Sequence, residues 1–232
     1  MYEILHTRRL TPVTKLFEVA APLVAKAARP GQFVILRTHD HGERIPVTIT
    51  DSDAEAGTVT VVIQEVGATS KMANALADGD RFHDFAGPLG EAARLRESGH
   101  VVCVGGGFGA AAILSILKGL APAATRTSAI VGARTAELVI LEDRLSAATD
   151  TLHVCTDDGS AGYQGLVTGK LEELIRAGEP IDEVVAIGPM VMMRAVAATT
   201  APHGIATQVS LDPIMIDGTG MCGACRVTVG GE

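Results

Sequence analysis

From residue 100 onward, apolar runs alternate with stretches of helical periodicity, and this alternation constrains the fold more than any other feature of the sequence. The first run, Val101–Gly105, precedes a helical stretch at Gly109–Leu120, and a last run closes the series at Ile205–Val209. The other expected strands and helices are Thr127–Ala133, Glu137–Ala147, Thr151–Thr156, Leu166–Ala177, Glu183–Ile187 and Met190–Ala198. Continuous apolar strands separated by helices are typical of a parallel sheet covered on both faces, so we expect five such strands in one sheet.

The first hundred residues have a different pattern, with short β runs separated by glycine- and proline-containing turns. The expected strands are Tyr2–Arg8, Thr14–Ala20, Gln32–Arg37, Arg44–Thr50, Thr58–Glu65 and Asp80–Phe85, with one short helix at Ser70–Leu76. This pattern predicts a six-stranded antiparallel barrel or sandwich. We expect domains at 1–98 and 99–210, and a glycine-rich segment at 211–232 that includes a strand over residues 226–229.

The charge balance and the hydropathy exclude two classes of protein. The chain has 19 Lys and Arg against 27 Asp and Glu, a net charge of −8, which argues against nucleic-acid binding. The longest apolar run, Val101–Leu117, is shorter than the roughly 20 residues that cross a membrane, and the first residues do not resemble a secretory signal. Four cysteines are too few for a disulfide framework. We therefore expect a cytoplasmic protein without a membrane span.

A glycine cluster follows the first strand of the parallel series and opens a helix. Gly105, Gly107 and Ala110 match the spacing G-x-G-x-x-G/A, and Gly106 and Gly109 lie in the same turn. Glycines allow the backbone to approach a pyrophosphate, and a helix N-terminus supplies free N–H donors. This turn predicts a Rossmann-like nucleotide site. Nucleotide preference stays open between NAD and NADP.

Three further turns follow strands at the same predicted edge, where open α/β sheets bind ligands. Arg134 is placed to meet a 2′-phosphate or an adenosine ribose, or is a solvated loop residue. Asp157 lines a ligand or belongs to a plain Asx turn. The turn Gly188-Pro189-Met190 begins another helix and is either part of the nucleotide site or an ordinary turn.

In the β-rich half, Arg44 and Thr48 are four residues apart, which places both on one face of a strand. An Arg fork and a hydroxyl on one face suit a phosphate or the edge of a flavin ring, whereas an edge strand with a charged outer face is the simpler alternative. His39 and His41 have no third ligand nearby in the sequence and are taken as a polar loop.

The pair Cys222 and Cys225 lies in the C-terminal glycine-rich segment. A zinc knuckle requires a second pair of ligands, and a thioredoxin-type pair opens a helix, whereas a β run follows here. The remaining interpretation is a plant-type [2Fe-2S] loop, whose C-x4-C-x2-C spacing is kept with Asp217 in the first position. An ionised carboxylate is a plausible iron ligand, although Asp217 is alternatively a turn residue. The distant fourth cysteine does not occur in these 232 residues, so we expect a cut-short segment with three of four ligands.

Together these features resemble the ferredoxin reductase superfamily, and within it the electron-transfer subunits that carry FAD and a [2Fe-2S] cluster. The chain is most similar to small (alpha) subunits of NADH-dependent reduced ferredoxin:NADP oxidoreductases, also called sulfide dehydrogenase subunits, and more distantly to dihydroorotate dehydrogenase electron-transfer subunits. The latter typically have Cys in place of Asp217. The segments that carry the resemblance are 30–33, 43–49, 87–90, 105–109, 156–159, 188–190 and 217–225.

The resemblance implies an FAD-binding barrel, an NAD(H)-binding sheet and an iron-sulfur loop, and it assigns residues to each. The residues implied to lie against FAD are Arg44, Pro46 and Thr48, with Gly67, Thr69 and Ser70 near its pyrophosphate. The residues implied to line the nicotinamide nucleotide are Gly105, Gly106, Gly107, Gly109, Arg134, Asp157, Gly188, Pro189 and Met190. The implied cluster ligands are Asp217, Cys222 and Cys225.

The function implied is that of an electron-transfer flavoprotein subunit of a ferredoxin:NAD(P) oxidoreductase. NADH gives a hydride to FAD, and electrons pass singly through the cluster to a larger flavin or iron-sulfur subunit and so indirectly to ferredoxin. No catalytic side chain is required, because the cofactors carry the chemistry. Two alternatives stay open: a nucleotide-binding redox sensor without turnover, and a dihydroorotate dehydrogenase electron-transfer subunit.

Overall fold

In a computed structural model, which describes residues 1–211 and 214–231, the chain forms two compact units. The first contains Met1–Ala92 and the segment from Leu211 onward, and the second contains Ala93–Ser210. The sequence places the first boundary after residue 98 and treats 211–232 as a separate segment, of which residues 212, 213 and 232 lie outside the described residues. None of the helices in the described ranges is both long and apolar enough to cross a membrane.

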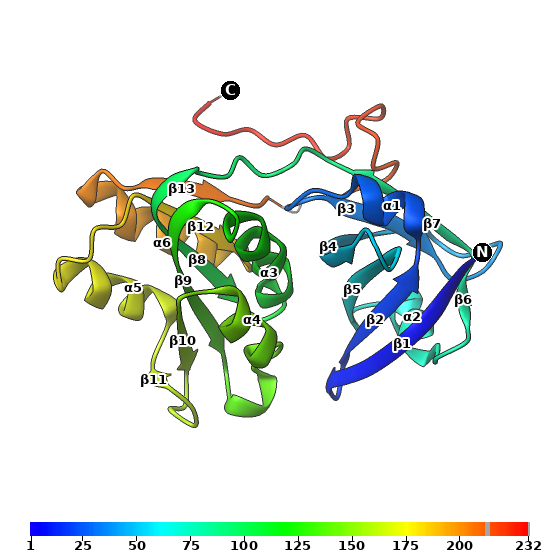
Figure 1. The fold of residues 1–232 in the computed structure, drawn as a ribbon, viewed down its shortest axis with the longest axis horizontal. Coiled ribbons are helices and arrows are strands. Elements are labelled where there is room, and N and C mark those ends of the chain that lie inside the picture. The colour runs from blue at the N-terminus through cyan, green and yellow to red at the C-terminus, as the bar shows by residue number, and fades with distance from the viewer. Residues whose placement is uncertain (212–213, 232) are drawn as a thin grey trace. The chain divides into compact units, whose positions relative to one another are not determined.

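The first unit is a near-barrel of antiparallel strands in the order β6-β1-β2-β5-β4-β3-β7 (Figure 1). The strands are β1 (Tyr2–Thr11), β2 (Thr14–Ala20), β3 (Phe33–Arg37), β4 (Ile45–Asp53), β5 (Thr58–Gln64), β6 (Arg81–Phe82) and β7 (Asp84–Leu89). Only His83 separates the two edge strands β6 and β7, so the sheet curls until its edges approach each other. The antiparallel barrel is confirmed, with seven strands in place of six. The extra strand arises because the chain pairs with β1 before His83 and with β3 after it.

Aromatic rings fill the interior of the near-barrel. Phe17, Phe82 and Phe85 are buried, with ring centroids 5.6 Å apart for Phe17 and Phe82 and 6.2 Å apart for Phe82 and Phe85. Tyr2 packs against Phe85 from the edge of this cluster, at 5.7 Å. Two helices flank the strands: α1 (Pro22–Ala27), which has no counterpart in the sequence prediction, and α2 (Ala68–Ala75).

The second unit is a parallel sheet in the order β11-β10-β9-β8-β12-β13. The strands are β8 (Ser98–Gly106), β9 (Ala124–Ala133), β10 (Thr151–Thr156), β11 (Tyr163–Gln164), β12 (Glu183–Ile187) and β13 (Ala206–Val209). Five of them match the predicted strands, which confirms the parallel α/β sheet. The sixth, β11, has only two residues, too few to show a periodicity of their own.

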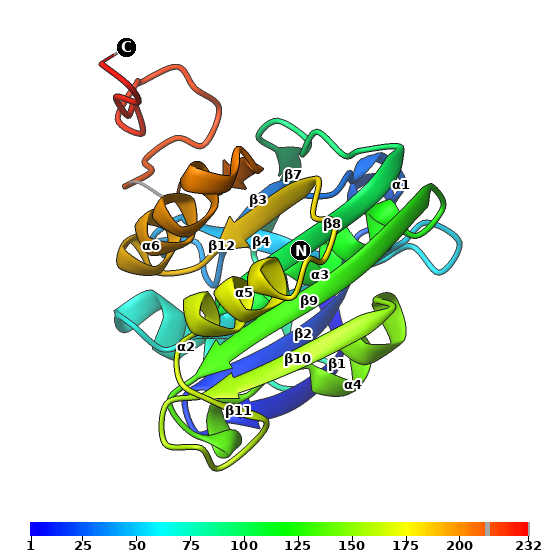
Figure 2. The same cartoon turned by 90° about the vertical axis from the view of Figure 1, so that its left-hand side faces the viewer.

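Helices cover both faces of this sheet, with α3 (Gly109–Leu120) and α4 (Glu142–Ala148) on one face and α5 (Val167–Arg176) and α6 (Met190–Thr200) on the other (Figures 1 and 2). Almost every residue of α3 is buried, as its apolar sequence requires. The single helix predicted at Glu137–Ala147 is wrong. It is divided into a 3-10 turn at Ala136–Leu138 and α4, because Leu141 has a φ of 58°, which interrupts a right-handed helix.

The strand predicted over residues 226–229 is also wrong. These four residues have no strand conformation, and their side chains are exposed. A strand needs a neighbour to accept and donate its backbone hydrogen bonds, and no strand in the described part of the chain pairs with this segment. The β-branched residues in the sequence are therefore not sufficient to form one.

Candidate functional site

Two turns predicted separately from the sequence meet where the second sheet reverses its order. In the sheet, β8 lies between β9 and β12. The chain continues from β8 to β9 on one side, whereas β12, which comes later in the sequence, pairs with β8 on the other side. Gly105 at the end of β8 pairs with Ile187 at the end of β12. The turns that follow these strands, which begin at Gly107 and Gly188, are therefore adjacent. Such a switch point is where open α/β sheets bind ligands.

The start of α3 presses directly against the end of β12. A Cβ atom built on Gly109 would overlap the carbonyl oxygen of Ile187 and lie 2.6 Å from its carbonyl carbon. Only a glycine permits this approach. A residue that the sequence did not single out, Met192 of α6, packs on the same region, since its side chain occupies the space next to Gly106. Methionines at helix starts are common in cores, so sequence alone carried no signal for this contact.

The open part of the turn is at Gly107. Its φ is +53°, its N–H donates to the Gly132 carbonyl at 2.8 Å, and no heavy atom lies within 4 Å of the position a Cβ would take. Phe108 separates this glycine from the N-terminus of α3, where the Ala110 and Ala111 N–H groups donate to the Gly107 and Phe108 carbonyls at 3.2 and 3.0 Å. A pyrophosphate fits such a cradle, because the backbone is exposed and the helix dipole favours an anion.

The same sheet edge carries the predicted residues after β9 and β10. The backbone N–H of Asp157 donates to Ala133 at 3.1 Å, and the side chains of Arg134 and Asp157 are both exposed. Among the described residues, Arg134 has no side-chain hydrogen bond or ion pair, so its guanidinium is available to a ligand. Asp158, by contrast, forms an Asx turn, in which it accepts from the Ser160 N–H at 3.0 Å and from the Ser160 hydroxyl at 2.6 Å.

In the first unit, β4 presents part of the predicted flavin face. Val47 and Ile49 point into the core, whereas the alternating residues Pro46 and Thr48 are half-buried on the other face. The prediction that Arg44 shares a strand face with Thr48 is wrong in one respect, since β4 begins at Ile45 and Arg44 precedes it. The Arg44 side chain is exposed and makes no hydrogen bond or ion pair within the described ranges.

The first turn of α2 contains the other predicted flavin residues, and its two hydroxyl groups are already engaged. The Ser70 hydroxyl accepts from the Val66 and Gly67 N–H groups, both at 2.9 Å, and donates to the Gly67 carbonyl at 3.0 Å. The Thr69 hydroxyl donates to the Glu43 carboxylate at 2.9 Å. Gly67 is exposed, and no heavy atom lies within 4 Å of the position of its Cβ. The groups left for a phosphate are the backbone N–H groups of this turn.

In the C-terminal segment, Asp217 organises its own loop. One carboxylate oxygen accepts from the Met221 and Cys222 N–H groups, both at 3.0 Å, and from the Thr219 hydroxyl at 3.1 Å, and the other accepts from the Thr219 N–H at 3.2 Å. Desolvation raises the pKa of Asp217, but the hydrogen bonds from Cys222 and Thr219 outweigh it and lower the pKa to about 2. The carboxylate is therefore ionised at neutral pH.

The donor types in this loop suit iron, but their arrangement does not form a site. Cys222 is exposed and Cys225 is half-buried. Among residues 1–211 and 214–231, no three His, Cys, Asp or Glu side chains lie close enough together to hold a metal ion. Asp217, Cys222 and Cys225 are thus neighbours in the sequence that this structure does not bring together as a ligand set.

Alkylation with iodoacetamide at pH 8, in reduced and metal-free protein, should modify Cys222 and Cys225 and leave Cys103 and Cys155 intact. Burial raises the pKa of Cys103 to about 12 and that of Cys155 to about 11, so almost no reactive thiolate forms at either. Mass spectrometry of peptides identifies the modified sites, and denatured protein, in which all four cysteines react, is the control. Modification of Cys103 or Cys155 in the folded protein would contradict the burial described here.

Known proteins with similar sequences and structures define the family. A solved structure of an NADH-dependent reduced ferredoxin-NADP oxidoreductase matches the whole chain with 40% identity and a TM-score of 0.94, over 83% of that chain. An uncharacterised protein from the adh 3′ region of Clostridium beijerinckii is 44% identical over the whole chain and 81% of its own length. A dihydroorotate dehydrogenase B electron transfer subunit homolog of Thermotoga maritima is 43% identical over 93% of this chain and 76% of its own. No family model matches the chain.

The near-barrel followed by a parallel sheet is the ferredoxin reductase-like FAD/NAD-binding fold, which confirms the resemblance expected from the sequence. The chain belongs to the family of electron-transfer subunits of flavin oxidoreductase complexes that includes the dihydroorotate dehydrogenase B electron transfer subunits and their homologues.

Proposed function

We propose that this chain is the electron-transfer flavoprotein subunit of a ferredoxin:NAD(P) oxidoreductase, which binds NAD(H) on its parallel sheet and FAD on its near-barrel. The observation that carries the proposal is the meeting of the Gly107 and Gly188 turns at the switch point between β8 and β12. When bound, FAD would supply the chemistry that links a two-electron hydride donor to one-electron acceptors. The side chains of the chain itself bind and orient the two cofactors.

The nucleotide half of the proposal rests on an open backbone cradle with a free guanidinium at the same edge of the sheet. Gly107 leaves the backbone open to a pyrophosphate, and the helix α3 begins directly behind it. Arg134 offers an unpaired guanidinium at the same edge, which suits the ribose or phosphate of the adenosine half. Asp157 and the turn Gly188-Pro189-Met190 complete the proposed lining.

The part of the proposal that concerns FAD depends on residues of the first unit. Pro46 and Thr48 offer a half-buried surface, and Arg44 offers an unpaired guanidinium beside it. The backbone N–H groups at the start of α2, next to the open Gly67, are the donors proposed for the pyrophosphate, while Thr69 and Ser70 hold that turn in shape.

Purified protein should be yellow and take up one FAD. Arg44→Gln should weaken FAD binding by about tenfold or more, because a charge-assisted hydrogen bond contributes about 1.5–3 kcal/mol. Quenching of flavin fluorescence measures the dissociation constant. Arg8→Gln is the matched control, since Arg8 is likewise exposed and free of ion pairs among the described residues. A colourless protein that takes up no FAD, or one that binds NADH without bleaching a flavin, would reject this function.

A [2Fe-2S] cluster at Asp217, Cys222 and Cys225 is the third cofactor that we propose. The carboxylate and the two thiols are suitable donors for iron, although the three side chains are not gathered into one site in this structure. Alkylation with iodoacetamide also tests this cluster assignment. Reconstitution with iron and sulfide should protect Cys222 and Cys225, and unchanged alkylation after reconstitution would reject the assignment.

The partner proposed is a larger flavin or iron-sulfur subunit, through which electrons reach ferredoxin. The match of the whole chain to the NADH-dependent reduced ferredoxin-NADP oxidoreductase structure, at 40% identity, supports this choice. A dihydroorotate dehydrogenase complex is the alternative, because an electron transfer subunit homolog of that enzyme is 43% identical. Co-expression with each candidate partner distinguishes the two complexes. In a ferredoxin:NADP oxidoreductase complex, reduced ferredoxin with NADP should change the flavin absorbance. In a dihydroorotate dehydrogenase complex, dihydroorotate should do so.

A further inference from the structure

The helix α2 is attached to the near-barrel mainly by polar contacts, because its apolar packing is limited to Ala73 in the core and to the partly buried Leu76 at its C-terminal end. It has eight residues, and its buried side chains are Thr69, Ser70, Ala73 and Asn74. A helix of this length is not stable alone in water, and one buried alanine contributes little apolar area. The orientation of α2 therefore depends on the hydrogen bonds that its polar side chains and its ends make with the strands.

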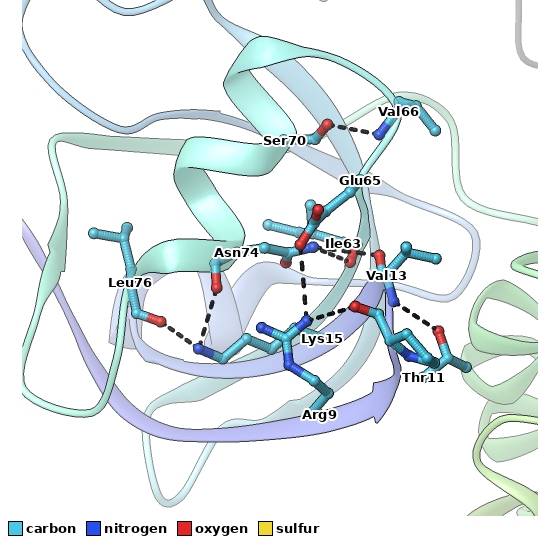
Figure 3. Close-up of polar contacts among 11 residues, drawn as sticks. Arg9, Thr11, Val13, Lys15, Ile63, Glu65, Val66, Ser70, Asn74 and Leu76 are labelled. Carbon is cyan, nitrogen blue, oxygen red and sulfur yellow. Dashed lines mark hydrogen bonds and ion pairs between the residues drawn. The ribbon is translucent and has the colours of Figure 1, made fainter.

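Asn74 ties the C-terminal half of α2 to the strand β5 and to the turn between β1 and β2 (Figure 3). Its side chain is 2% exposed, and its amide nitrogen donates to the Ile63 carbonyl at 3.3 Å and to the Val13 carbonyl at 3.4 Å. Ile63 belongs to β5, and Val13 lies between β1 and β2. The amide oxygen has no hydrogen-bond partner among the described residues. One side chain thus binds both β5 and the β1–β2 turn and fixes the distance of α2 from them.

Lys15 of β2 caps the same end of the helix, as Figure 3 shows. Its ammonium donates to the Asn74 carbonyl at 3.4 Å and to the Leu76 carbonyl in a short contact. Carbonyls in the last turn have no donor within the helix, and a cation there also complements the helix dipole. The ammonium lies 5.3 Å from the centroid of the Phe17 ring, and the residue is 9% exposed. Burial, with a smaller contribution from Arg9, lowers the pKa of Lys15.

The opposite end of α2 carries the proposed phosphate donors. Because the Ser70 and Thr69 hydroxyls are engaged within the protein, a phosphate is left with the backbone N–H groups, whose direction follows the helix axis. Eight residues span only about 12 Å, so a tilt at the Lys15 end redirects those groups at the other end.

We propose that Lys15 and Asn74 are positioning residues for the pyrophosphate of FAD: by holding the C-terminal end of α2 against β2 and β5, they aim its first N–H groups at the phosphates. This inference rests on the proposed flavin function. Neither residue touches the flavin, and neither was singled out by the sequence, in which Lys15 is one cation within an otherwise ordinary strand.

The test compares FAD with riboflavin, which has the same ring and ribityl chain but no phosphate. Lys15→Met removes the ammonium and keeps the stem, and Asn74→Leu removes the amide and keeps the size. We expect each to weaken FAD binding by about tenfold, the effect of about one lost hydrogen bond, and to change riboflavin binding by less than about twofold. Lys15→Arg keeps a cationic donor and should recover part of the affinity. Lys26→Met, at an exposed lysine of α1, is the control for the lost charge.

The outcomes are separable. If wild-type protein binds no FAD, the proposed function fails, and the inference with it. If wild-type protein binds FAD but the variants bind it equally well, or lose FAD and riboflavin alike, only the inference is overturned. Thermal unfolding accompanies each titration. Loss of a cooperative transition in both variants would show that the two residues support the whole near-barrel, which would also overturn a specific role toward the phosphates.

Discussion

Gly109→Ala should destabilise the unit Ala93–Ser210 by about 2 kcal/mol or more. The added methyl group would overlap the Ile187 carbonyl oxygen and lie 3.1 Å from Gly188 Cα, and both are backbone atoms that no rotamer change can move. Overpacking of this kind costs about 1–3 kcal/mol and occasionally more, and an immovable neighbour places it at the upper end. Alanine is the better helix former by about 1 kcal/mol, which offsets only part of the cost.

Urea unfolding followed by circular dichroism measures this change. Gly107→Ala is the control two residues away, because its Cβ would meet no heavy atom within 4 Å and only the positive φ is unfavourable, at about 1–2 kcal/mol. Native proteins are stable by about 5–15 kcal/mol, so the Gly109 variant should lose a large fraction of its stability. A Gly109→Ala protein with the wild-type urea midpoint would mean that α3 does not approach β12 this closely.

Gly107→Ala should leave the protein folded but weaken NADH binding at least tenfold. Its Cβ would stand in the open space of the turn, where the pyrophosphate is proposed to contact the backbone. Overpacking by one methyl group costs about 1–3 kcal/mol, and a backbone that cannot move aside places the cost in the upper part of that range, which corresponds to about tenfold or more in affinity. Fluorescence titration with NADH measures the dissociation constant.

Gly178→Ala is the matched variant for this second prediction. Gly178 follows α5 in the same unit, has a φ of +78° and also has no heavy atom within 4 Å of its Cβ position. It therefore carries the same backbone strain without lying at the proposed site, and its NADH affinity should equal that of the wild type. Equal affinity in all three proteins would place the nucleotide elsewhere.

Much of the architecture was predictable because it depends on patterns of neighbouring residues in the sequence. Each strand of the parallel sheet longer than two residues appears as an apolar run, and the glycine spacing at 105–109 marks a strand-to-helix turn without reference to any distant residue. The errors arose where a local pattern was outweighed by its context. Leu141 takes a positive φ inside a helical pattern, and residues 226–229 have β-branched side chains but no strand to pair with among the described residues.

The candidate site was predictable in its parts but not in its assembly. Arg134, Asp157 and the two glycine turns were identified one by one, each with an ordinary turn as the alternative. The contact between Gly109 and Ile187 depends on the strand order, which places β12 beside β8. Likewise, Thr69 and Ser70 were expected near a phosphate, but only the structure shows that their hydroxyls bind Glu43 and the Gly67 backbone.

The sequence by itself determined the two kinds of sheet, the glycine turns and the donor types of the C-terminal loop, because periodicity and spacing report what each segment buries and how it turns. Tertiary structure alone decided that the Gly107 and Gly188 turns meet, that Lys15 and Asn74 hold α2, and that Asp217 accepts the N–H groups of its own loop. The physical reason is the same in each case. A side chain carries its hydrogen-bonding capacity in the sequence, but its partner is chosen by which strands and helices pack together.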